Sequence, residues 1–305
     1  MSTGNVKRIS DGNVLPKPEA SVHVRREGLR IFSRILLRAL LYLVLISVGF
    51  TMILPLLWML STSLKEPGVI FILPPQWIPN PPQWDNYVKL FQVLPFGRFL
   101  FNSIKIASIA TFGALLTSSM AAFAFARMRF PGRNIIFAIV LATLMIPFHV
   151  TLIPLFALYR WMGWLGTHLP LTVPYFFSTA FGIFLIRQFY LTIPQELVDA
   201  ARIDGCSFIE IYYKIFLPLS KPALATLGIF TFLGSWNNLI GPLVYLNEVS
   251  TMTVTLGLTL LTTQAGGRWE LIQAGAVISV LPIIAIFLIG QEHFIQGIAR
   301  TGLKG

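Results

Sequence analysis

The chain contains 305 residues, of which 55% are hydrophobic and only 11% are charged, and its mean hydropathy is +0.74. Because so few charged residues cannot cover the surface of a soluble globular protein, the composition indicates an integral membrane protein. In a soluble chain the formal net charge of +11 would suggest nucleic-acid binding. Here we attribute the charge to membrane topology and expect no nucleic-acid partner.

Six apolar blocks are long enough for a helix to cross the hydrocarbon core, which takes about 20 residues. The blocks cover residues 35–60, 100–126, 135–158, 171–190, 223–246 and 271–290. We therefore expect an all-α membrane protein with six transmembrane helices. A polar arm of about thirty residues precedes the first block, which is longer than the apolar region of a signal peptide, so we expect an uncleaved anchor.

Cytoplasmic loops of membrane proteins carry an excess of Lys and Arg, and three segments of this chain do so. The cations are Lys7, Arg8, Lys17, Arg25, Arg26, Arg30 and Arg34 in the N-terminal arm (residues 1–34), Arg127, Arg129 and Arg133 after the second block, and Arg300 and Lys304 in the C-terminal tail (residues 295–305). Both termini and the loop at 192–222 are therefore predicted to be cytoplasmic. Arg30, Arg34 and Arg38 share one helical face that suits anionic membrane lipid headgroups.

The polar loop at 192–222 begins with a predicted short helix. Thr192 and Gln195 have the spacing of a capping box, and Pro194 is tolerated in a first helical turn. The helix is expected over 194–204, because Gly205 suits the left-handed residue that ends a helix.

A second short helix is predicted to follow directly. Ser207 and Glu210 form another capping box, and the helix should end at Leu217-Pro218, where the proline removes a backbone donor and bends the chain toward the membrane. The loop therefore reads as helix, glycine turn, helix and proline bend.

The first loop helix has a surface that suits a protein partner. Leu197, Ala200 and Ala201 fall on one side with Asp204 one turn on, so small residues allow close approach and acids supply charged contacts. The alternative is a helix lying along the membrane surface, but such helices are usually cationic. The segment carries the acids Glu196, Asp199, Asp204 and Glu210 against the cations Arg202 and Lys214. We therefore expect docking to another protein.

The run Asp199-Ala200-Ala201-Arg202-Ile203-Asp204-Gly205, followed by Leu217-Pro218-Leu219 and Pro222, resembles the EAA loop of ABC importer permeases, the segment that docks into the ATPase subunit. Further matching stretches are Asn102-Ser103, residues 121–127, 130–133, 193–197 and 234–238, and the ending 301–305. The resemblance covers nearly the whole chain. It is closest to the carbohydrate-uptake branch, similar to the smaller membrane subunit of the maltose importer. Asp199 departs from the Glu that is usual in the family.

The resemblance implies the type I importer fold, with a five-helix core at 100–294 and the first helix, 35–61, outside it. ATPase coupling would fall to Glu196, Leu197, Asp199, Ala200, Ala201, Asp204, Gly205, Leu217 and Pro218. The implied partners are a second permease subunit forming a heterodimer, two ATP-binding subunits and an extracytoplasmic sugar-binding protein, with a sugar or sugar-like substrate. The location would be a bacterial or archaeal plasma membrane.

Two external loops are candidates for contact with that binding protein. One is residues 62–99, whose proline-rich stretch at 74–82 is too stiff for a spanning helix and suits a lid. The other is residues 247–270 with Gly266-Gly267, which resembles the family's loop that reaches into the binding protein.

Neither catalysis nor a bound cofactor is expected in this chain. His23, His149, His168 and His293 are scattered without metal-ligand spacing, and there is no phosphate-binding loop, so ATP and Mg would be bound by the partner ATPase. The single cysteine, Cys206, can form no internal disulfide.

Candidates for the translocation path are polar groups at membrane depth, because these are costly unless they face a cavity or another helix. They are Ser118, His149, Trp236, Asn237 and Asn238. An aromatic face beside amides suits a sugar, whereas the alternative is hydrogen bonding between packed helices.

Two other functions stay open on sequence grounds. A secondary transporter should show charged residues deep in the bundle, and the predicted spans have essentially none at the midplane. A membrane signalling subunit could use the same cytoplasmic loop. Co-purification with an ATPase or a solute-binding protein would discriminate these functions from an importer subunit.

Overall fold

The computed structural model describes the backbone of residues 19–177, 179–264 and 268–302, and the side chains of 34–177, 179–262 and 268–291. Every regular element in these ranges is a helix, so the all-α class is confirmed. Four of the described helices are long and apolar enough to cross a membrane, in the segments 34–63, 96–127, 169–191 and 269–291. Two bent helix pairs raise the number to six if each pair is one span.

The chain divides into two units, residues 1–57 and 58–305. The first unit contains most of α1 (Glu19–Ser63), a single helix that contains Pro55. Residues 35–60 are therefore helical, as the sequence predicts. Lys7, Arg8 and Lys17 of the cationic arm lie outside the described residues.

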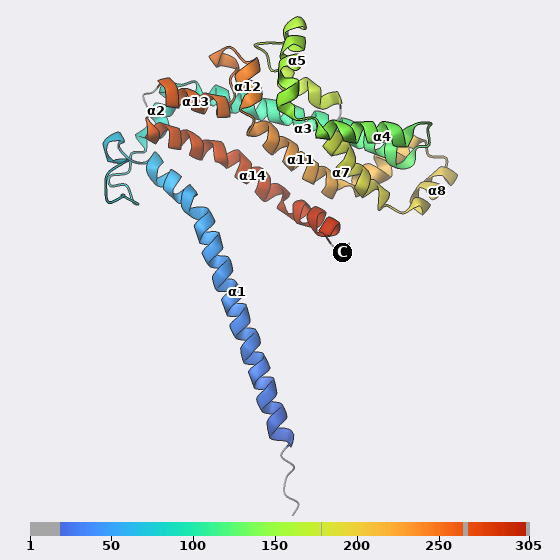
Figure 1. The fold of residues 1–305 in the computed structure, drawn as a ribbon, viewed down its shortest axis with the longest axis horizontal. Helices are drawn as coiled ribbons and strands as arrows, with labels where there is room; N and C mark the ends of the chain where they lie inside the picture. Colours follow the sequence, from blue (N-terminus) through green and yellow to red (C-terminus); the bar gives the residue numbers. More distant parts are fainter. Residues whose placement is uncertain (1–18, 178, 265–267, 303–305) are drawn as a thin grey trace, which may run out of the picture. The chain divides into compact units, whose positions relative to one another are not determined.

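The second unit is built around the long helix α3 (Phe96–Arg127). Helices α7 (Ala180–Leu191) and α11 (Lys221–Trp236) pack against α3, and α14 (Trp269–Gly302) packs against α11 (Figure 1). Gly182 of α7 lies so close to Ser118 of α3 that an added Cβ would stand 2.5 Å from the Ser118 Oγ. Small residues at such contacts allow helices to approach closely.

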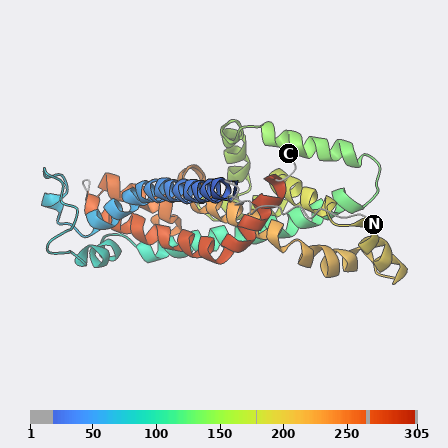
Figure 2. The ribbon, with the colours of Figure 1, turned by 90° about the horizontal axis from the view of Figure 1, so that it is seen from below.

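The third apolar block is broken into two helices, so its prediction as one helix over 135–158 is wrong. Helix α4 (Arg133–Ala142) continues as a 3-10 turn, η2 (Thr143–Met145), and α5 (Phe148–Trp161) then leaves at 99° (Figure 2). The break lies at Pro147, which has no amide hydrogen and disfavours helical backbone in the residue before it. Ile146 is accordingly extended, with φ −81° and ψ 114°.

The fifth block is also two helices rather than the single helix expected over 223–246. Helix α11 ends at Trp236, and α12 (Ile240–Tyr245) begins after a short turn. The turn is held by Asn238, whose Oδ1 accepts a hydrogen bond from the Gly241 amide at 3.0 Å. The fourth block contains α6 (Leu169–Thr172) and the 3-10 helix η3 (Val173–Phe177) before α7.

The two segments predicted to be external contain short helices of their own. Residues 62–99 hold η1 (Pro67–Val69) and α2 (Asp85–Val93), and the stretch at 74–82 is not helical, as predicted. Residues 247–270 hold η5 (Val249–Thr251) and α13 (Val254–Gln264), which the sequence reading did not foresee. Gly266-Gly267 lies outside the described residues.

The 247–270 segment is attached to the first turns of α3. Asn102 donates from Nδ2 to the carbonyls of Ser250 and Met252 at 3.0 and 2.9 Å. The Ser103 hydroxyl accepts a hydrogen bond from the Val254 amide at 2.8 Å. These contacts give a structural role to the Asn102-Ser103 pair.

Candidate functional site

The polar segment between α7 and α11 folds as a compact series of short helices at one end of α3 (Figure 1). The series is α8 (Gln195–Ile203), a turn at Gly205, α9 (Phe208–Ile211), the π-helix η4 (Tyr212–Phe216) and α10 (Leu217–Leu219). Gly205 has φ +81°, so it is the left-handed residue that the sequence predicts. The predicted helix at 194–204 agrees with α8 within one residue at each end.

The first predicted capping box is wrong. The Thr192 hydroxyl donates to the Phe189 carbonyl at 2.7 Å, because α7 runs on to Leu191 and Thr192 forms its C-terminal cap. The N-cap of α8 is Pro194, with no side-chain hydrogen bond. Gln195 instead donates from Nε2 to Asp199 Oδ1 at 3.1 Å.

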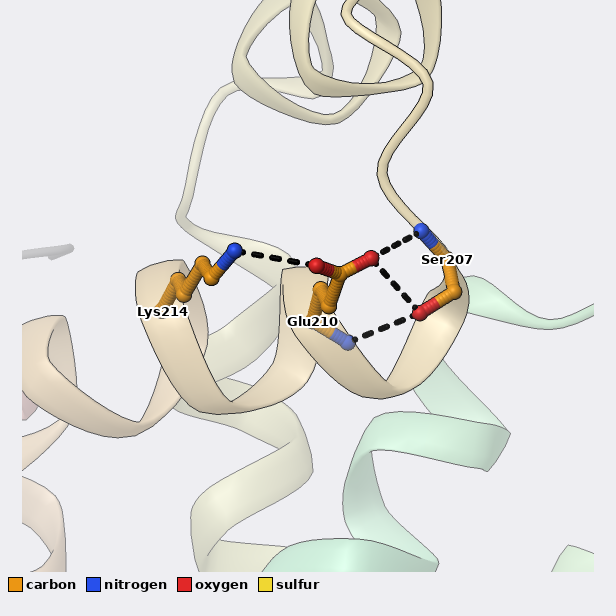
Figure 3. Close-up of polar contacts among 3 residues, drawn as sticks. All are labelled: Ser207, Glu210 and Lys214. Atoms are coloured by element: carbon orange, nitrogen blue, oxygen red, sulfur yellow. Dashed lines mark hydrogen bonds and ion pairs between the residues drawn. The ribbon is translucent and has the colours of Figure 1, made fainter.

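The second predicted capping box is present (Figure 3). Glu210 Oε2 accepts the Ser207 amide hydrogen at 2.9 Å, and the Ser207 hydroxyl accepts the Glu210 amide hydrogen at 3.3 Å. Lys214 Nζ lies 3.0 Å from Glu210 Oε1. The Ser207 backbone hydrogen bond, followed by the bond from Lys214, lowers the pKa of Glu210 to about 2.

The second loop helix ends later than predicted. The chain turns at Ser220, with a bend of 76° before α11, and not at Leu217-Pro218. The preceding π-turn relieves the clash that the Pro218 ring would make with the carbonyl of Lys214, four residues earlier. Pro218 is exposed and Leu217 is half-buried.

Helix α8 has one face turned inward. Val198 and Ala201 are 3% and 7% exposed and pack in a cluster with Tyr190, Ile211 and Phe216. The expectation that Ala201 shares an outer face with Leu197 and Ala200 is therefore wrong for Ala201. Which of the two alanines is buried depends on how α8 is rotated about its axis against the cluster. The local sequence does not reveal this rotation.

The opposite face of the segment is open and partly apolar. The exposed residues of the predicted coupling set are Glu196, Leu197, Asp199, Ala200, Asp204, Gly205 and Pro218. Leu197, Ile203 and Ile209 are 43%, 87% and 77% exposed. A polar loop with exposed large aliphatic side chains offers a surface that a partner protein would cover.

Arg127, the last residue of α3, binds this segment. The sequence analysis used Arg127 for topology and as part of the matching stretch 121–127, and it predicted no contact for this side chain. Its guanidinium donates to the Gln195 side chain at 2.6 Å, to the Tyr190 carbonyl at 2.7 Å and to the Ile193 carbonyl. It also lies 5.2 Å from the centre of the Phe216 ring. The signal that could have revealed it is its position at the end of the Ala121–Arg127 motif.

A second attachment joins the π-helix to α3. The Ser119 hydroxyl lies 2.7 Å from the Tyr212 hydroxyl, and the Phe123 ring contacts the rings of Tyr190 and Phe216. The segment is therefore attached to α3 by hydrogen bonds and by an aromatic cluster.

The structure does not bring the candidate path residues together as one surface. Ser118 is fully buried, and its Oγ lies 3.4 Å from the Thr179 hydroxyl. Trp236 is 2% exposed and stacks on Phe232. Both side chains pack within the subunit in this conformation.

The other three path candidates are more accessible. His149 is exposed near the start of α5, and Asn237 is exposed at the end of α11. Asn238 is half-buried and occupied by its bond to Gly241. Asn237 therefore stays the better candidate of the two amides.

Among the described residues, no three His, Cys, Asp or Glu side chains are grouped so that they could hold a metal ion. Cys206 is a free thiol and is half-buried beside the cluster of α8. The described chain is thus a helical membrane protein with a compact polar segment, residues 192–222, between two of its apolar helices.

A comparison with protein-family models identifies the family of this membrane protein. Residues 87–300 match the model described as "Binding-protein-dependent transport system inner membrane component". The chain belongs to this family, and it is the permease component of an ABC importer.

Curated relatives cover most of this chain and of their own length. The arabinooligosaccharides transport system permease protein AraQ of Halalkalibacterium halodurans is 37% identical over 80% of this chain and 86% of its own. The sulfoquinovosyl glycerol transport system permease protein SmoH of Agrobacterium fabrum is 32% identical over 82% and 88%. The sn-glycerol-3-phosphate transport system permease protein UgpE of Yersinia enterocolitica is 31% identical over 90% and 98%.

A solved structure has the same fold. It is a bacterial ABC transporter involved in the import of the acidic polysaccharide alginate, and the match covers 87% of this chain and 97% of that one. The TM-score is 0.75 at 23% sequence identity. The importer permease fold is therefore shown.

Proposed function

We propose that this chain forms half of the pore of an ATP-driven sugar importer and couples the pore to a separate ATPase through the segment at 192–222. The sugar class is supported by the relatives, whose names specify arabinooligosaccharides, sulfoquinovosyl glycerol and sn-glycerol-3-phosphate. All three solutes are polyhydroxylated. The substrate would accordingly be a sugar or a sugar-like compound.

The observation that carries the coupling role is the two-sided character of α8. Its inner face is packed on the cluster around Tyr190 and Phe216, and its outer face exposes Leu197, Asp199 and Ala200. A helix of nine residues is marginal in water by itself, so its attachment through Arg127 presents a preformed surface. Such a surface loses little conformational entropy on docking.

The proposed assembly contains a second permease subunit, two ATP-binding subunits and an extracytoplasmic sugar-binding protein. ATP and Mg would be bound in the ATPases, and this chain would have no catalytic role. Both termini and the coupling segment would lie in the cytoplasm, with 62–99 and 247–270 facing the binding protein. A second solved structure with the same fold, at a TM-score of 0.63, is a bacterial alginate ABC transporter in complex with alginate pentasaccharide-bound periplasmic protein, and it supports this arrangement.

In this mechanism ATP binding closes the two ATPases and moves the coupling segments that are seated on them. Because each segment is attached rigidly to α3, the movement passes to the membrane helices and opens the pore outward. Hydrolysis resets the pore. Leu217 and Pro218 would contribute to the coupling segment as part of α10, which precedes the turn at Ser220, and the polar path would include Asn237.

The test is a mild-detergent pull-down of the tagged chain carrying Ala200→Trp. Ala200 is exposed on the outer face, so a bulky side chain should block docking and leave the fold intact. We expect the variant to retain the second permease and to lose the ATPase. The matched control is Val88→Trp, at a 56% exposed position of α2, which should retain both partners.

Two results would overturn the proposal. If Ala200→Trp retains the ATPase as well as the wild type does, α8 is not the docking surface. If no ATPase accompanies the wild type under any condition, the importer role fails, and a secondary transporter or a signalling subunit becomes the better explanation.

A further inference from the structure

The turn between α3 and α4 encloses an open depression that the proposed function does not use. Its volume is about 490 Å³, and its lining is Arg129, Phe130, Gly132, Arg133, Asn134 and Ile135. The turn exists because Gly132 adopts φ +75° and reverses the chain at the start of α4.

The depression is strongly cationic. Arg129 is exposed and makes no hydrogen bond or ion pair within the described residues. Arg133 uses its guanidinium only on neutral groups, the Met128 carbonyl at 3.2 Å and the Asn134 side chain at 3.4 Å. Neither arginine is among the two ion pairs that form in the described part of the chain, which are Lys214–Glu210 and Arg268–Glu270.

A third cation reinforces this charge from the neighbouring helix. Arg187 of α7 lies with its guanidinium 4.2 Å from the centre of the Phe137 ring of α4, and its charge is close enough to Arg133 for the two to repel. A cluster of like charges without an acid is stabilised when an anion binds to it.

The surface beside the depression is apolar. On α4, Ile135, Ile136 and Ile139 are 69%, 45% and 61% exposed. Because α4 belongs to an apolar block predicted to lie in the membrane, lipid acyl chains would cover these side chains directly beside the arginines. A molecule with an anionic head and hydrocarbon chains would satisfy both surfaces.

We propose that the depression binds the phosphate headgroup of an anionic phospholipid, with its acyl chains along the isoleucines of α4. The depression lies at the α8 end of α3, since Arg127, two residues before Arg129, binds Gln195. The site would therefore lie in the cytoplasmic leaflet if the orientation proposed above is correct. Each arginine near a membrane surface contributes about fivefold to lipid binding, so both together contribute about 30-fold.

The experiment uses the assembled importer in nanodiscs that contain a photoreactive phosphatidylglycerol. We expect light to label the peptide that spans residues 128–142, and excess phosphatidylglycerol should suppress the label where phosphatidylcholine does not. The concentration of phosphatidylglycerol needed to suppress the label should rise about 30-fold in the variant with Arg129→Gln and Arg133→Gln. It should rise about fivefold with Arg129→Gln alone. Replacing both residues by Lys should preserve most of the label.

The matched control is Lys89→Gln with Arg98→Gln, which removes two exposed cations near the other end of α3 and should leave the label on 128–142 unchanged. Suppression by millimolar inorganic phosphate as strong as that by phosphatidylglycerol would mean that a soluble anion is the ligand. Labelling that appears only after the ATPases are removed would mean that protein covers the site. Either result overturns the lipid assignment.

The proposal is separable from the coupling role. The Gln variants should retain the second permease and the ATPase in the pull-down described above, whereas Ala200→Trp should lose the ATPase and keep the lipid label. A Gln variant that loses both partners and the label would show a general folding defect, and the single Arg129→Gln variant, which breaks no described contact, would then decide the outcome.

Discussion

Arg127 Nη1 lies 2.6 Å from Gln195 Oε1, and this hydrogen bond joins the last residue of α3 to the first residue of α8. The same guanidinium binds the carbonyls of Tyr190 and Ile193, which precede α8. A single side chain therefore attaches the start of the proposed coupling segment to the 32-residue helix α3. Movement of α8 away from α3 would break several charge-assisted hydrogen bonds at once, which costs about 1.5–3 kcal/mol for each bond.

Replacing Arg127 by Met should weaken coupling. The variant keeps much of the side-chain volume but removes the guanidinium hydrogen bonds to Gln195 and to two backbone carbonyls. We therefore expect ATP hydrolysis to continue while solute uptake per ATP falls by about tenfold. The measurement is the ratio of uptake to hydrolysis in proteoliposomes. Arg160→Met, at an exposed arginine of α5 whose side chain has no described partner, is the control and should keep the wild-type ratio. An unchanged ratio for Arg127→Met would show that the attachment does not transmit movement.

Replacing Gly205 by Ala should destabilise the turn between α8 and α9. Nothing lies within 4 Å of an added Cβ, so the cost comes only from the left-handed backbone and should be about 1–2 kcal/mol. Gly205→Asn should cost less, because Asn tolerates this conformation. Chemical denaturation of the purified subunit measures both. Equal losses for Ala and Asn would contradict a purely conformational cause.

Ala200 and Ala201 should respond in opposite ways to the same substitution. Ala201→Leu overpacks the cluster under α8 and should cost about 1–3 kcal/mol of subunit stability. Ala200→Leu, on the exposed face, should change stability by less than about 0.5 kcal/mol but should reduce ATPase retention. Thermal unfolding and the pull-down give the two readouts. The assignment of faces fails if Ala200→Leu is the more destabilising change.

The Glu210 carboxylate should give the loop a pH-dependent stability. Its pKa is about 2 in the folded protein against an ordinary value of 4.5, so the charged form is favoured by folding. The contribution is present above pH 4.5 and is lost as the pH falls through about 2. We expect Glu210→Gln to lower the thermal midpoint at pH 6, and the difference from the wild type to shrink toward pH 2. A difference independent of pH would contradict this account.

Gly182 should be sensitive to a single added methyl group. A Cβ there would lie 2.5 Å from the Ser118 Oγ and 2.6 Å from the Thr179 Oγ1, so Gly182→Ala should push α7 from α3 and lower stability by about 1–3 kcal/mol. Gly234→Ala is the control, since nothing lies within 4 Å of its added Cβ. It should be neutral or slightly stabilising, because Ala favours a helix over Gly. Thermal unfolding in detergent measures both, and equal midpoints would rule out the close contact.

Local chemistry made parts of the fold predictable. Gly205 and the Ser207–Glu210 pair act within a few residues, so their spacing was enough to locate the turn and the helix start. The breaks at Pro147 and near Asn237 were missed, because a long apolar run does not distinguish one helix from two. A proline in an apolar run does not by itself predict a helix break, because Pro55 and Pro282 lie inside α1 and α14 without ending them.

The packing of the candidate site could not be predicted in the same way. Arg127 binds atoms of residues 63 to 68 positions further along the chain, and no local pattern encodes such contacts. Likewise, both Ala200 and Ala201 fitted a docking face until the cluster under α8 showed which one is buried. The roles of the coupling and path residues stay predictions that the experiments above address.

Helix α3 has 32 residues, so it is about 48 Å long. Near its first turns Asn102 and Ser103 hold residues 250–254, and at its last residue Arg127 holds the coupling segment. A tilt of about 5° around the middle of such a rod moves the two ends by about 2 Å in opposite directions. In the proposed importer, a movement of the coupling segment would therefore displace residues 250–254 by a similar distance in the opposite direction.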